Sequence, residues 1–335
     1  MSLIPRYSLG MELSDSLFKL VEIRKGLRQT RLTQYVTHPL LPMWSGEREL
    51  AEREELIQSI RDALRGRKFR TTKVHLSLSN RHVVTGIWYV PEMRAGRMRR
   101  WIENKIFSEW ALPFDDPIFD FKTIGHVWSD GDQQEVVIVA TSRRYVEEVT
   151  DLVRCCGLDP ISIGLSCLDL QRWMDFSNET TNHKWAAIHL SRTGIEVSLF
   201  FHGLLQGGCF LPLSMEEHLL NVPDRPAVDP LTPMLTQEHQ VASYGDSLLN
   251  NLNKLEPEWL QEELLQSSRS WMLSGEGVDF DRLVDYLRSK SDRSIHLSPT
   301  PQGLIKDETK LHASRWLGNA LSVPLGAALT GVKLS

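Results

Sequence analysis

The sequence predicts a mixed α/β protein of two domains, each with its own copy of one β-hairpin unit. A small α+β subdomain is inserted into the first domain. Residues 9–23 and 188–200 are each an apolar strand, a short polar turn and a second alternating strand. Residues 80–160 follow the order strand, helix, strand, strand, helix, which predicts the insertion. The 335 residues suffice for roughly two domains of about 150 residues each. Two facing turns of this kind can hold the phosphates of a nucleotide between two domains.

Composition and charge limit the possible classes of function. The chain is 41% hydrophobic and 24% charged, which is ordinary for a globular domain. Its 38 basic and 43 acidic residues give a net charge of −5, so bulk charge does not indicate a nucleic-acid partner. The four cysteines are Cys155, Cys156, Cys167 and Cys209. Their spacing fits no usual zinc site, and we expect reduced thiols in a cytoplasmic protein.

Neither a secretion signal nor a membrane span is expected. The start, Met-Ser-Leu-Ile-Pro-Arg, lacks a charged head followed by an apolar run. The most apolar stretch, 195–213, is interrupted by His202, Gln206 and paired glycines, and falls short of about 18 apolar residues. We therefore expect the protein to reach a membrane only through a partner.

The first hairpin is expected to continue into a sheet. A third strand is predicted over 30–36, followed by a Pro-containing loop over 38–45 and a charged helix over about 46–66. Apolar residues recur in that helix at spacings of three and four, which is typical of one buried side. They are Leu50, Leu56, Ile57, Ile60 and Leu64. Alternation predicts strands over 71–78 and 83–90.

The inserted subdomain is expected to contain two helices around two further strands. The predicted elements are a helix over 91–110, strands over 118–127 and 135–140, a helix over 142–156, and then a strand that passes into a helix over 160–173. Gly157 is expected to end the helix before it, because glycine favours the left-handed cap conformation.

The second half is expected to repeat the hairpin and to end in a long helix. The predicted elements are a three-strand meander over 185–213, helices over 238–255 and 258–267, a strand over 270–273, a turn over 274–277, a helix over 279–288 and a final helix over 311–330. Four prolines make 221–233 an expected loop or linker.

Several short segments, taken in order, are similar to those of a known family. They are 19–22 (Lys-Leu-Val-Glu), 90–93 (Val-Pro-Glu-Met), 112–114 (Leu-Pro-Phe), 120–121 (Asp-Phe), 157–160 (Gly-Leu-Asp-Pro) and the closing segment 322–331. Their order and spacing resemble the PilM family, the actin-like cytoplasmic component of type IV pilus assembly, which is related in architecture to FtsA. The resemblance implies an α/β, actin-like (ribonuclease-H-like duplicated) two-domain fold.

The resemblance also implies a division of the chain. Residues 1–79 and 161–184 would form the first actin-like domain, and residues 80–160 the inserted α+β subdomain. Residues 185–335 would form the second domain, with the last helix as a candidate to return to the first.

The resemblance implies a nucleotide site between the hairpin turns, but this chain departs from the family pattern there. Glu12 and His189 stand where the family has aspartates, and imidazole is a poor ligand for magnesium. Ser14 and Ser191 replace glycines, and their side chains would crowd the phosphate path at about 1–3 kcal/mol each. The expected remnant of the site comprises Glu12, Ser14, Asp15, Ser16, Lys19, His189, Ser191, Ser274, Gly275 and Gly277. We expect lost or very weak Mg-ATP binding, with no catalytic residue, no metal and no other cofactor.

Two residues of this region leave alternatives open. Lys19 is either a solvated strand lysine or a phosphate contact. Glu276 interrupts the Gly-Gly pair that the family has in its adenine-side turn, so its charge is expected over the purine.

The resemblance names a partner as well. The family uses a groove beside the insert to take the short cytoplasmic tail of a membrane-anchored partner, PilN. The expected partner-binding residues here are Val83, Val84, Ile87 and Trp88. The pilus motor ATPase is a further expected partner, and the expected location is the cytoplasm, peripheral to the inner face of the cell membrane.

The function expected from these observations is a scaffold of type IV pilus, competence or secretion assembly without turnover of its own. The alternatives are an active Mg-ATP-dependent ATPase of the same machinery and, less favoured, a small-molecule kinase of the same fold. The sequence shows no carboxylate near either turn that could activate an acceptor hydroxyl, which disfavours the small-molecule kinase.

Overall fold

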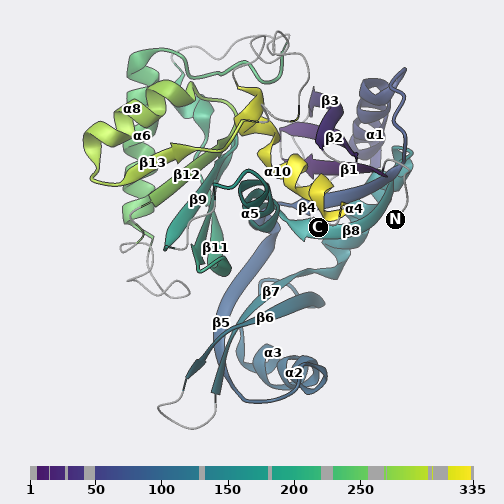
Figure 1. Cartoon of the computed structure of the whole chain (residues 1–335), viewed down its shortest axis with the longest axis vertical. Coiled ribbons are helices and arrows are strands. Elements are labelled where there is room, and N and C mark those ends of the chain that lie inside the picture. Colours follow the sequence, from purple (N-terminus) through teal and green to yellow (C-terminus); the bar gives the residue numbers. More distant parts are fainter. Residues whose placement is uncertain are drawn as a thin grey trace.

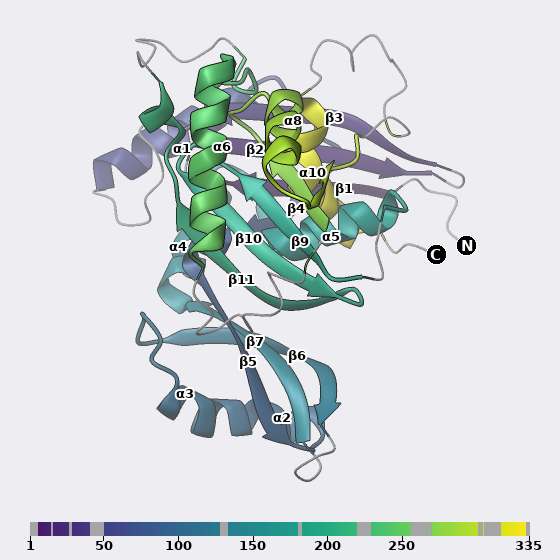
Figure 2. The ribbon, with the colours of Figure 1, turned by 90° about the vertical axis from the view of Figure 1, so that its left-hand side faces the viewer.

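The computed structural model describes residues 6–14, 16–26, 29–40, 50–127, 133–179, 183–219, 229–255, 268, 270–300, 304 and 316–332. Two five-stranded sheets lie beside each other, and a three-stranded sheet with its own helices projects from them (Figure 1). The view turned by 90° shows the same projection of the smaller part (Figure 2). We call the three parts the first half, the second half and the insert.

The first half is a sheet with strand order β3-β2-β1-β4-β8. Its elements are β1 (Arg6–Leu13), β2 (Leu17–Lys25), β3 (Thr30–Pro39), β4 (Lys73–Leu78), β8 (Asp159–Leu165), α1 (Leu50–Leu64) and α4 (Arg143–Cys155). β1 and β2 form the predicted first hairpin, in which Glu12 lies opposite Lys19. Leu56 and Ile60 of α1 and Val149 of α4 pack into one core with the sheet, which confirms the apolar side predicted for α1.

The ends of α4 are those that the sequence predicts. The Ser142 hydroxyl accepts from the backbone N–H of Tyr145 at the start, and Gly157 has a φ of +86° just past the end. α4 lies within the range 80–160 expected for the inserted subdomain, yet Val149, Leu152 and Val153 pack on the first sheet. We therefore describe the insert by its own three strands, and the division of the chain into domains stays a prediction.

The second half is a sheet with strand order β11-β10-β9-β12-β13. Its elements are β9 (Trp185–Leu190), β10 (Gly194–Phe201), β11 (Leu204–Pro212), β12 (Ser270–Gly275), β13 (Ser294–Leu297), a short 3₁₀ turn η3 (Met215–His218), α6 (Glu238–Asn253) and α8 (Phe280–Lys290). In both halves an antiparallel meander of three strands is followed by two parallel strands beside the first strand of the meander. The two halves therefore repeat one topology, as the paired hairpins predict. β13 was not predicted.

The insert is a sheet with strand order β5-β7-β6. Its elements are β5 (Val83–Pro91), β6 (Pro117–Val127), β7 (Gln133–Ser142), α2 (Ala95–Trp101), a π-helical turn η2 (Ile102–Ile106) and α3 (Phe107–Glu109), and η1 (Asn80–His82) joins it to β4. Met98 and Ile102 pack on the sheet with Val136 and Ile138. The predicted helix start at Pro91 is wrong, because Pro91 is the last residue of β5 and pairs with Gln133. A strand end tolerates the missing proline N–H.

Two buried helices, α5 (Ser166–Phe176) and α10 (Leu317–Thr330), join the halves (Figure 1). α10 packs on β1, β2 and α5, so the last helix returns to the first half. A Cβ added to Gly10 would lie 1.9 Å from the Pro324 carbonyl oxygen, and one added to Gly326 would lie 1.7 Å from the Asp169 carbonyl oxygen. Glycine at both positions lets three backbones approach closely.

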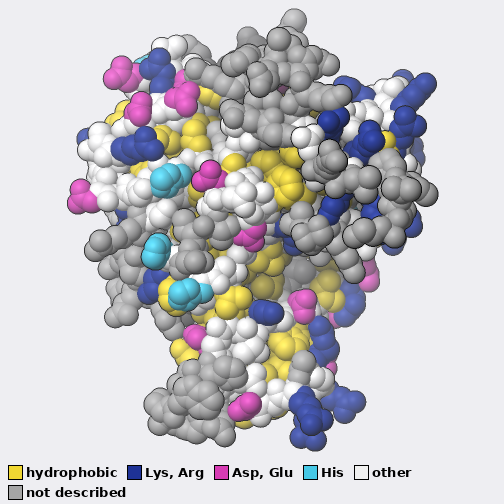
Figure 3. Space-filling model, viewed as in Figure 1, with side chains coloured by type: hydrophobic (Ala, Val, Ile, Leu, Met, Phe, Trp, Pro, Cys, Tyr) yellow, Lys and Arg dark blue, Asp and Glu magenta, His cyan; other side chains and the backbone are white. Residues whose placement is uncertain are grey.

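Several predicted features lie outside the described residues. They are most of the loop 38–45, the start of the helix 46–66, most of the linker 221–233, the helix 258–267, the start of the helix 311–330, and Asp15. All four cysteines are free thiols. Of the helices that the structure describes, none has the length and apolar character to cross a bilayer. On the face seen in Figure 3, Lys and Arg side chains gather on the side that carries α1 and at the tip of the insert.

Candidate functional site

The two hairpin turns are closed by serines in the same way. The backbone N–H of Ser14 donates to the Leu17 carbonyl (2.9 Å), and that of Ser191 donates to the Gly194 carbonyl (2.9 Å). Both hydroxyls donate to the same carbonyls, at 3.2 Å for Ser14 and 3.0 Å for Ser191. Each serine therefore uses its polar atoms inside its own turn.

Behind the turns lies a buried polar cluster drawn from both halves. We call it the cleft cluster and define it as Glu12, Lys19, His189, Ser274 and Glu276. The Lys19 ammonium donates to Glu12 Oε1 (3.0 Å) and to Glu276 Oε2 (2.5 Å). The His189 ring bonds Ser274 Oγ through Nδ1 (2.8 Å) and Glu12 Oε1 through Nε2 (3.1 Å). Lys19 is 0% exposed, so the interpretation of Lys19 as a solvated lysine is wrong.

The charges of the cleft cluster stabilise one another. Burial alone would raise the pKa of Glu12, but Lys19 and His189 outweigh it and lower that pKa to about 2. Burial would lower the pKa of Lys19, yet Glu12 and Glu276 raise it. Burial would likewise lower the pKa of His189, and Glu12 raises it above its usual 6.5. A protonated His189 therefore makes the cluster neutral, with two cations and two carboxylates.

The turn that carries Glu276 is fixed by its glycines. Gly275 has a φ of +107°, and a Cβ there would lie 1.9 Å from the Leu190 carbonyl oxygen. Gly277 has a φ of +97°, and a Cβ there would lie 2.4 Å from Met215 Sδ. The N–H of Glu276 donates to the same Leu190 carbonyl (3.0 Å). Packing against β9 and η3 therefore accounts for both glycines, and the side chain of Glu276 extends to Lys19.

A second polar junction joins the halves beside the insert. The N–H of Asn80 donates to Glu196 Oε2 (3.0 Å), and Asn80 Nδ2 donates to Ser198 Oγ (2.8 Å). The Ser166 hydroxyl also donates to Glu196 Oε2. Burial of Asp169, one turn along α5, raises its pKa to about 6.

The structure brings together four of the residues predicted for a nucleotide-site remnant, namely Glu12, Lys19, His189 and Ser274. Ser16 is buried, and its hydroxyl has no hydrogen-bond partner among the described residues. Sequence reasoning missed the role of Glu276 as a partner of Lys19, since 257 residues separate the two in the chain. Within the described ranges, no group of three or more His, Cys, Asp or Glu side chains is arranged to hold a metal ion.

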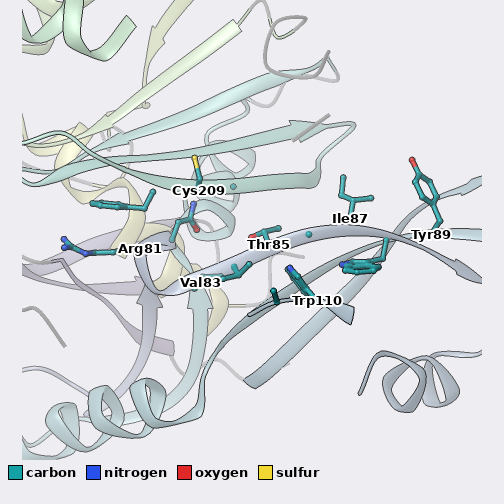
Figure 4. Close-up of a pocket in the computed structure, with 14 residues that line it drawn as sticks. Arg81, Val83, Thr85, Ile87, Tyr89, Trp110 and Cys209 are labelled. Carbon is teal, nitrogen blue, oxygen red and sulfur yellow. The ribbon is translucent and has the colours of Figure 1, made fainter. Parts of the chain in front are cut away.

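The four predicted partner residues lie together in a groove of about 750 Å³ between β5 and β11 (Figure 4). Besides Val83, Val84, Ile87 and Trp88, its walls are Asn80, Arg81, Thr85, Gly86, Tyr89, Trp110, Ala111, Gly208, Cys209 and Phe210. The Trp88 and Trp110 rings are 5.8 Å apart, and Arg81 lies 5.0 Å from the Phe210 ring centroid. The β11 wall was not predicted, because nothing in the sequence pairs 83–89 with 208–210.

A second, more apolar groove of about 560 Å³ lies on the other side of the insert. Its walls include Phe119 and Phe121 of β6, Ile163 of β8, and Leu204 and Leu205 of β11. Ile163 is 40% exposed there.

Comparison with known proteins assigns a family. Residues 10–190 match the profile of the family described as "Type IV pilus assembly protein PilM". The chain belongs to the PilM family. This match spans more than half of the chain and includes nearly all of the first hairpin, the insert, α5 and β9, and it ends before the turn of the second hairpin. A search of curated proteins found no match.

Solved structures agree on the fold of this PilM-family chain. One match is described as "PilM-PilN type IV pilus biogenesis complex", with 21% identity, a TM-score of 0.74, and coverage of 98% of this chain and 99% of that one. The ethanolamine utilization protein EutJ from Carboxydothermus hydrogenoformans matches at 9% identity and a TM-score of 0.49, with coverage of 98% of this chain and 90% of that one. A Bacteroides thetaiotaomicron protein described as having an actin-like ATPase fold matches at 11% identity and a TM-score of 0.42, with coverage of 92% and 96%. The match to the PilM-PilN complex and the repeated topology of the two halves together show the predicted actin-like two-domain α/β fold with a small insert.

Proposed function

We propose that this chain is a scaffold of type IV pilus or related competence or secretion assembly that binds the cytoplasmic tail of a PilN-like membrane partner without turning over ATP. The observation that carries the proposal is the groove between β5 and β11 in a chain of the PilM family. The similar complex contains PilN, and its identity of 21% supports a shared fold.

The groove suits an extended peptide because it runs along two edge strands. β5 and β11 are both edge strands of their sheets. The groove touches every residue from Val83 to Tyr89 and every residue from Gly208 to Phe210. Successive side chains of a strand point to opposite faces, so a groove that meets them all follows the edge rather than one face. An extended tail could pair with one of these edge strands and place alternate side chains beside Ile87 and Trp88.

The cleft cluster supports the loss of ATP binding. Glu12 and Glu276 are both bonded to Lys19, and His189 is bonded to Glu12. A triphosphate would face two buried carboxylates, and magnesium would face the His189 imidazole and the longer Glu12 side chain in place of two short carboxylates. This donor set does not fit Mg-nucleotide.

Location and further partners follow from the same proposal. The protein would lie in the cytoplasm at the inner face of the cell membrane, held there by the membrane partner. The pilus motor ATPase is a second proposed partner, and no nucleic acid is involved.

Isothermal titration tests the proposal with a synthetic N-terminal cytoplasmic tail of a PilN-like single-span membrane protein. We expect saturable binding of the tail at the same affinity with and without Mg-ATP, and no heat from Mg-ATP alone. A thermal shift with Mg-ATP sharpens the second part, because a ligand at 100 times its Kd stabilises by about 2.7 kcal/mol. Such a shift would favour the active ATPase instead, and absence of tail binding would contradict the scaffold.

A matched pair of variants locates the tail. Ile87→Asp places a charge in the β5–β11 groove, and Ile163→Asp places the same charge in the second groove. We expect Ile87→Asp to weaken tail binding by about tenfold or more and Ile163→Asp to leave it unchanged. The opposite pattern would move the tail to the second groove.

A further inference from the structure

We infer that the cleft cluster is an internal clamp: it holds the two halves closed without a ligand and so keeps the β5–β11 groove formed at all times. The inference deepens the proposed function and rests on it for the link to the groove. In this reading the substitutions that disfavour Mg-nucleotide also supply the bridge between the halves.

The bonds of the cluster divide into those within a half and those across the cleft. Glu12 and Lys19 lie opposite each other on the first hairpin, and their bond needs no second half. His189 and Ser274 lie opposite each other on β9 and β12, and their bond needs no first half. Only Lys19–Glu276 and Glu12–His189 cross the cleft. Each half therefore forms one bonded pair of its own, and the two bonds across the cleft connect the halves.

Contacts within the second half alone fix the turn that carries the Glu276 carboxylate. Glu276 lies between Gly275 and Gly277, whose positive φ values and close contacts with Leu190 and Met215 fix the turn. Its N–H is bonded to the Leu190 carbonyl. A rigid turn reduces the entropy that the Glu276 carboxylate loses on pairing with Lys19, which favours the closed state.

The clamp joins the two halves, and the groove lies between the second half and the insert, which continues from the first half. β5 continues from β4 of the first half through η1, whereas β11 belongs to the second half. Asn80 in η1, which lines the groove, bonds both Glu196 and Ser198 of β10, and Ser166 in α5 also bonds Glu196. A change in the angle between the halves therefore changes the width of the groove. Partner binding should depend on the clamp and not on nucleotide.

The test is a double variant that cuts both bonds across the cleft and, within the halves, only the His189–Ser274 bond. Glu276→Ala with His189→Ala leaves the Glu12–Lys19 pair intact, so that the first half keeps its charges balanced. The matched control is Glu217→Ala with His239→Ala, which removes the same two residue types from the exposed surface of the second half. Amide hydrogen exchange of the full chain is followed over residues 9–20, 186–195 and 271–278, and tail binding is measured by titration.

We expect exchange in these three segments to become at least about tenfold faster in the double variant, with α6 and the insert helices unchanged. Tail binding should weaken by about threefold to tenfold, and the control should match the wild type in both measurements. Unchanged exchange in the double variant would overturn the clamp, whatever the tail does. If the double variant does not fold, Glu276→Gln alone is measured; it keeps an acceptor but removes the charge, and unchanged exchange there would equally overturn the clamp.

The outcomes separate the clamp from the proposed function. Faster exchange together with unchanged tail binding would overturn the link between clamp and groove. A wild-type chain that binds no tail would contradict the proposed function, while the exchange measurement would still decide on the clamp.

Discussion

The cleft cluster lies between the two halves and the β5–β11 groove lies between the insert and the second half, but the two sites use their side chains in opposite ways. In the cleft, Lys19 and Glu276 are 0% and 3% exposed and are bonded to each other. In the groove, Tyr89 is 50% exposed and Ile87 and Trp88 are only half-buried. The cleft therefore presents little to a ligand, whereas the groove leaves apolar and aromatic surface for one.

The difference teaches where to look for function in a duplicated fold. A cleft between two hairpin turns suggests a ligand by its topology alone, yet here the charged side chains of the cleft cluster are bonded to one another. The groove has no counterpart within the duplication, because the insert that forms one wall occurs only once. Four predictions test this contrast, and they follow in order of decreasing effect.

The largest effect is expected for Lys19→Met. The change leaves the Glu12 and Glu276 carboxylates buried without their shared cation, and breaking a buried pair costs about 3–5 kcal/mol. Urea unfolding measures the loss of stability. Lys73→Met is the matched control, since Lys73 is an exposed strand lysine, and it should change stability by less than about 0.5 kcal/mol. If both variants cost the same, the cleft is not the closed structural site described here.

Gly275→Ala should have the next largest effect. A Cβ there meets the Leu190 carbonyl oxygen at 1.9 Å and the backbone has a positive φ, so we expect a loss of about 2–3 kcal/mol without any ligand present. Gly66→Ala separates strain from crowding, because Gly66 has a φ of +78° but nothing within 4 Å of its added Cβ. It should cost only about 1 kcal/mol. If Gly275→Ala and Gly66→Ala lose the same stability, close packing against Leu190 is not the reason for glycine at position 275.

Tyr89→Ala should weaken tail binding in the groove without changing the stability of the fold. Tyr89 lines the groove and is half exposed, so its removal should weaken tail binding by about threefold to tenfold while stability changes by less than about 0.5 kcal/mol. Tyr35→Ala is the matched control, because Tyr35 is 38% exposed on β3 and does not line the groove. An equal effect of the two changes on tail binding would remove Tyr89 from the binding surface.

Local patterns predicted most of the elements but few of the contacts between them. Both hairpins were predictable because alternation over 9–23 and 188–200 is a local signal, and α4 was predictable from Ser142 and Gly157. Pro91 misled the prediction, since a proline suits both the first turn of a helix and the end of an edge strand. β13 has only four residues, too few for a periodic signal.

The candidate sites show the same limit. The turn substitutions at Ser14, His189 and Ser191 are visible in the sequence and predict a damaged nucleotide site. The partner of Lys19 is not visible, because Glu276 lies 257 residues away and reaches Lys19 only when the halves close. In the groove, Val83 and Trp88 could be chosen by resemblance, whereas Phe210 joins them only through the packing of β11 beside β5.

The smallest effect is expected from the titration of His189, and its sign follows from the cluster. Glu12 raises the pKa of His189 above the unfolded value of 6.5, against the opposing effects of burial and of Lys19, and Glu196 adds to the increase. The protonated ring therefore stabilises the folded state. That contribution is complete below about pH 6.5 and is lost as the pH rises through the folded pKa. The free energy of unfolding should fall over this range, as urea titrations at a series of pH values will measure.

Two glutamine variants isolate this effect. His189→Gln should remove the fall in the free energy of unfolding above about pH 6.5. His75→Gln is the matched control, because burial, with a smaller effect of Arg172, lowers the pKa of His75, and its contribution to stability rises with pH only up to about 6.5. Without His75 the decline above pH 6.5 should therefore stay as in the wild type. If the decline in His189→Gln equals that of the wild type, His189 does not carry the second cation of the cleft cluster, and Lys19 alone balances the two carboxylates.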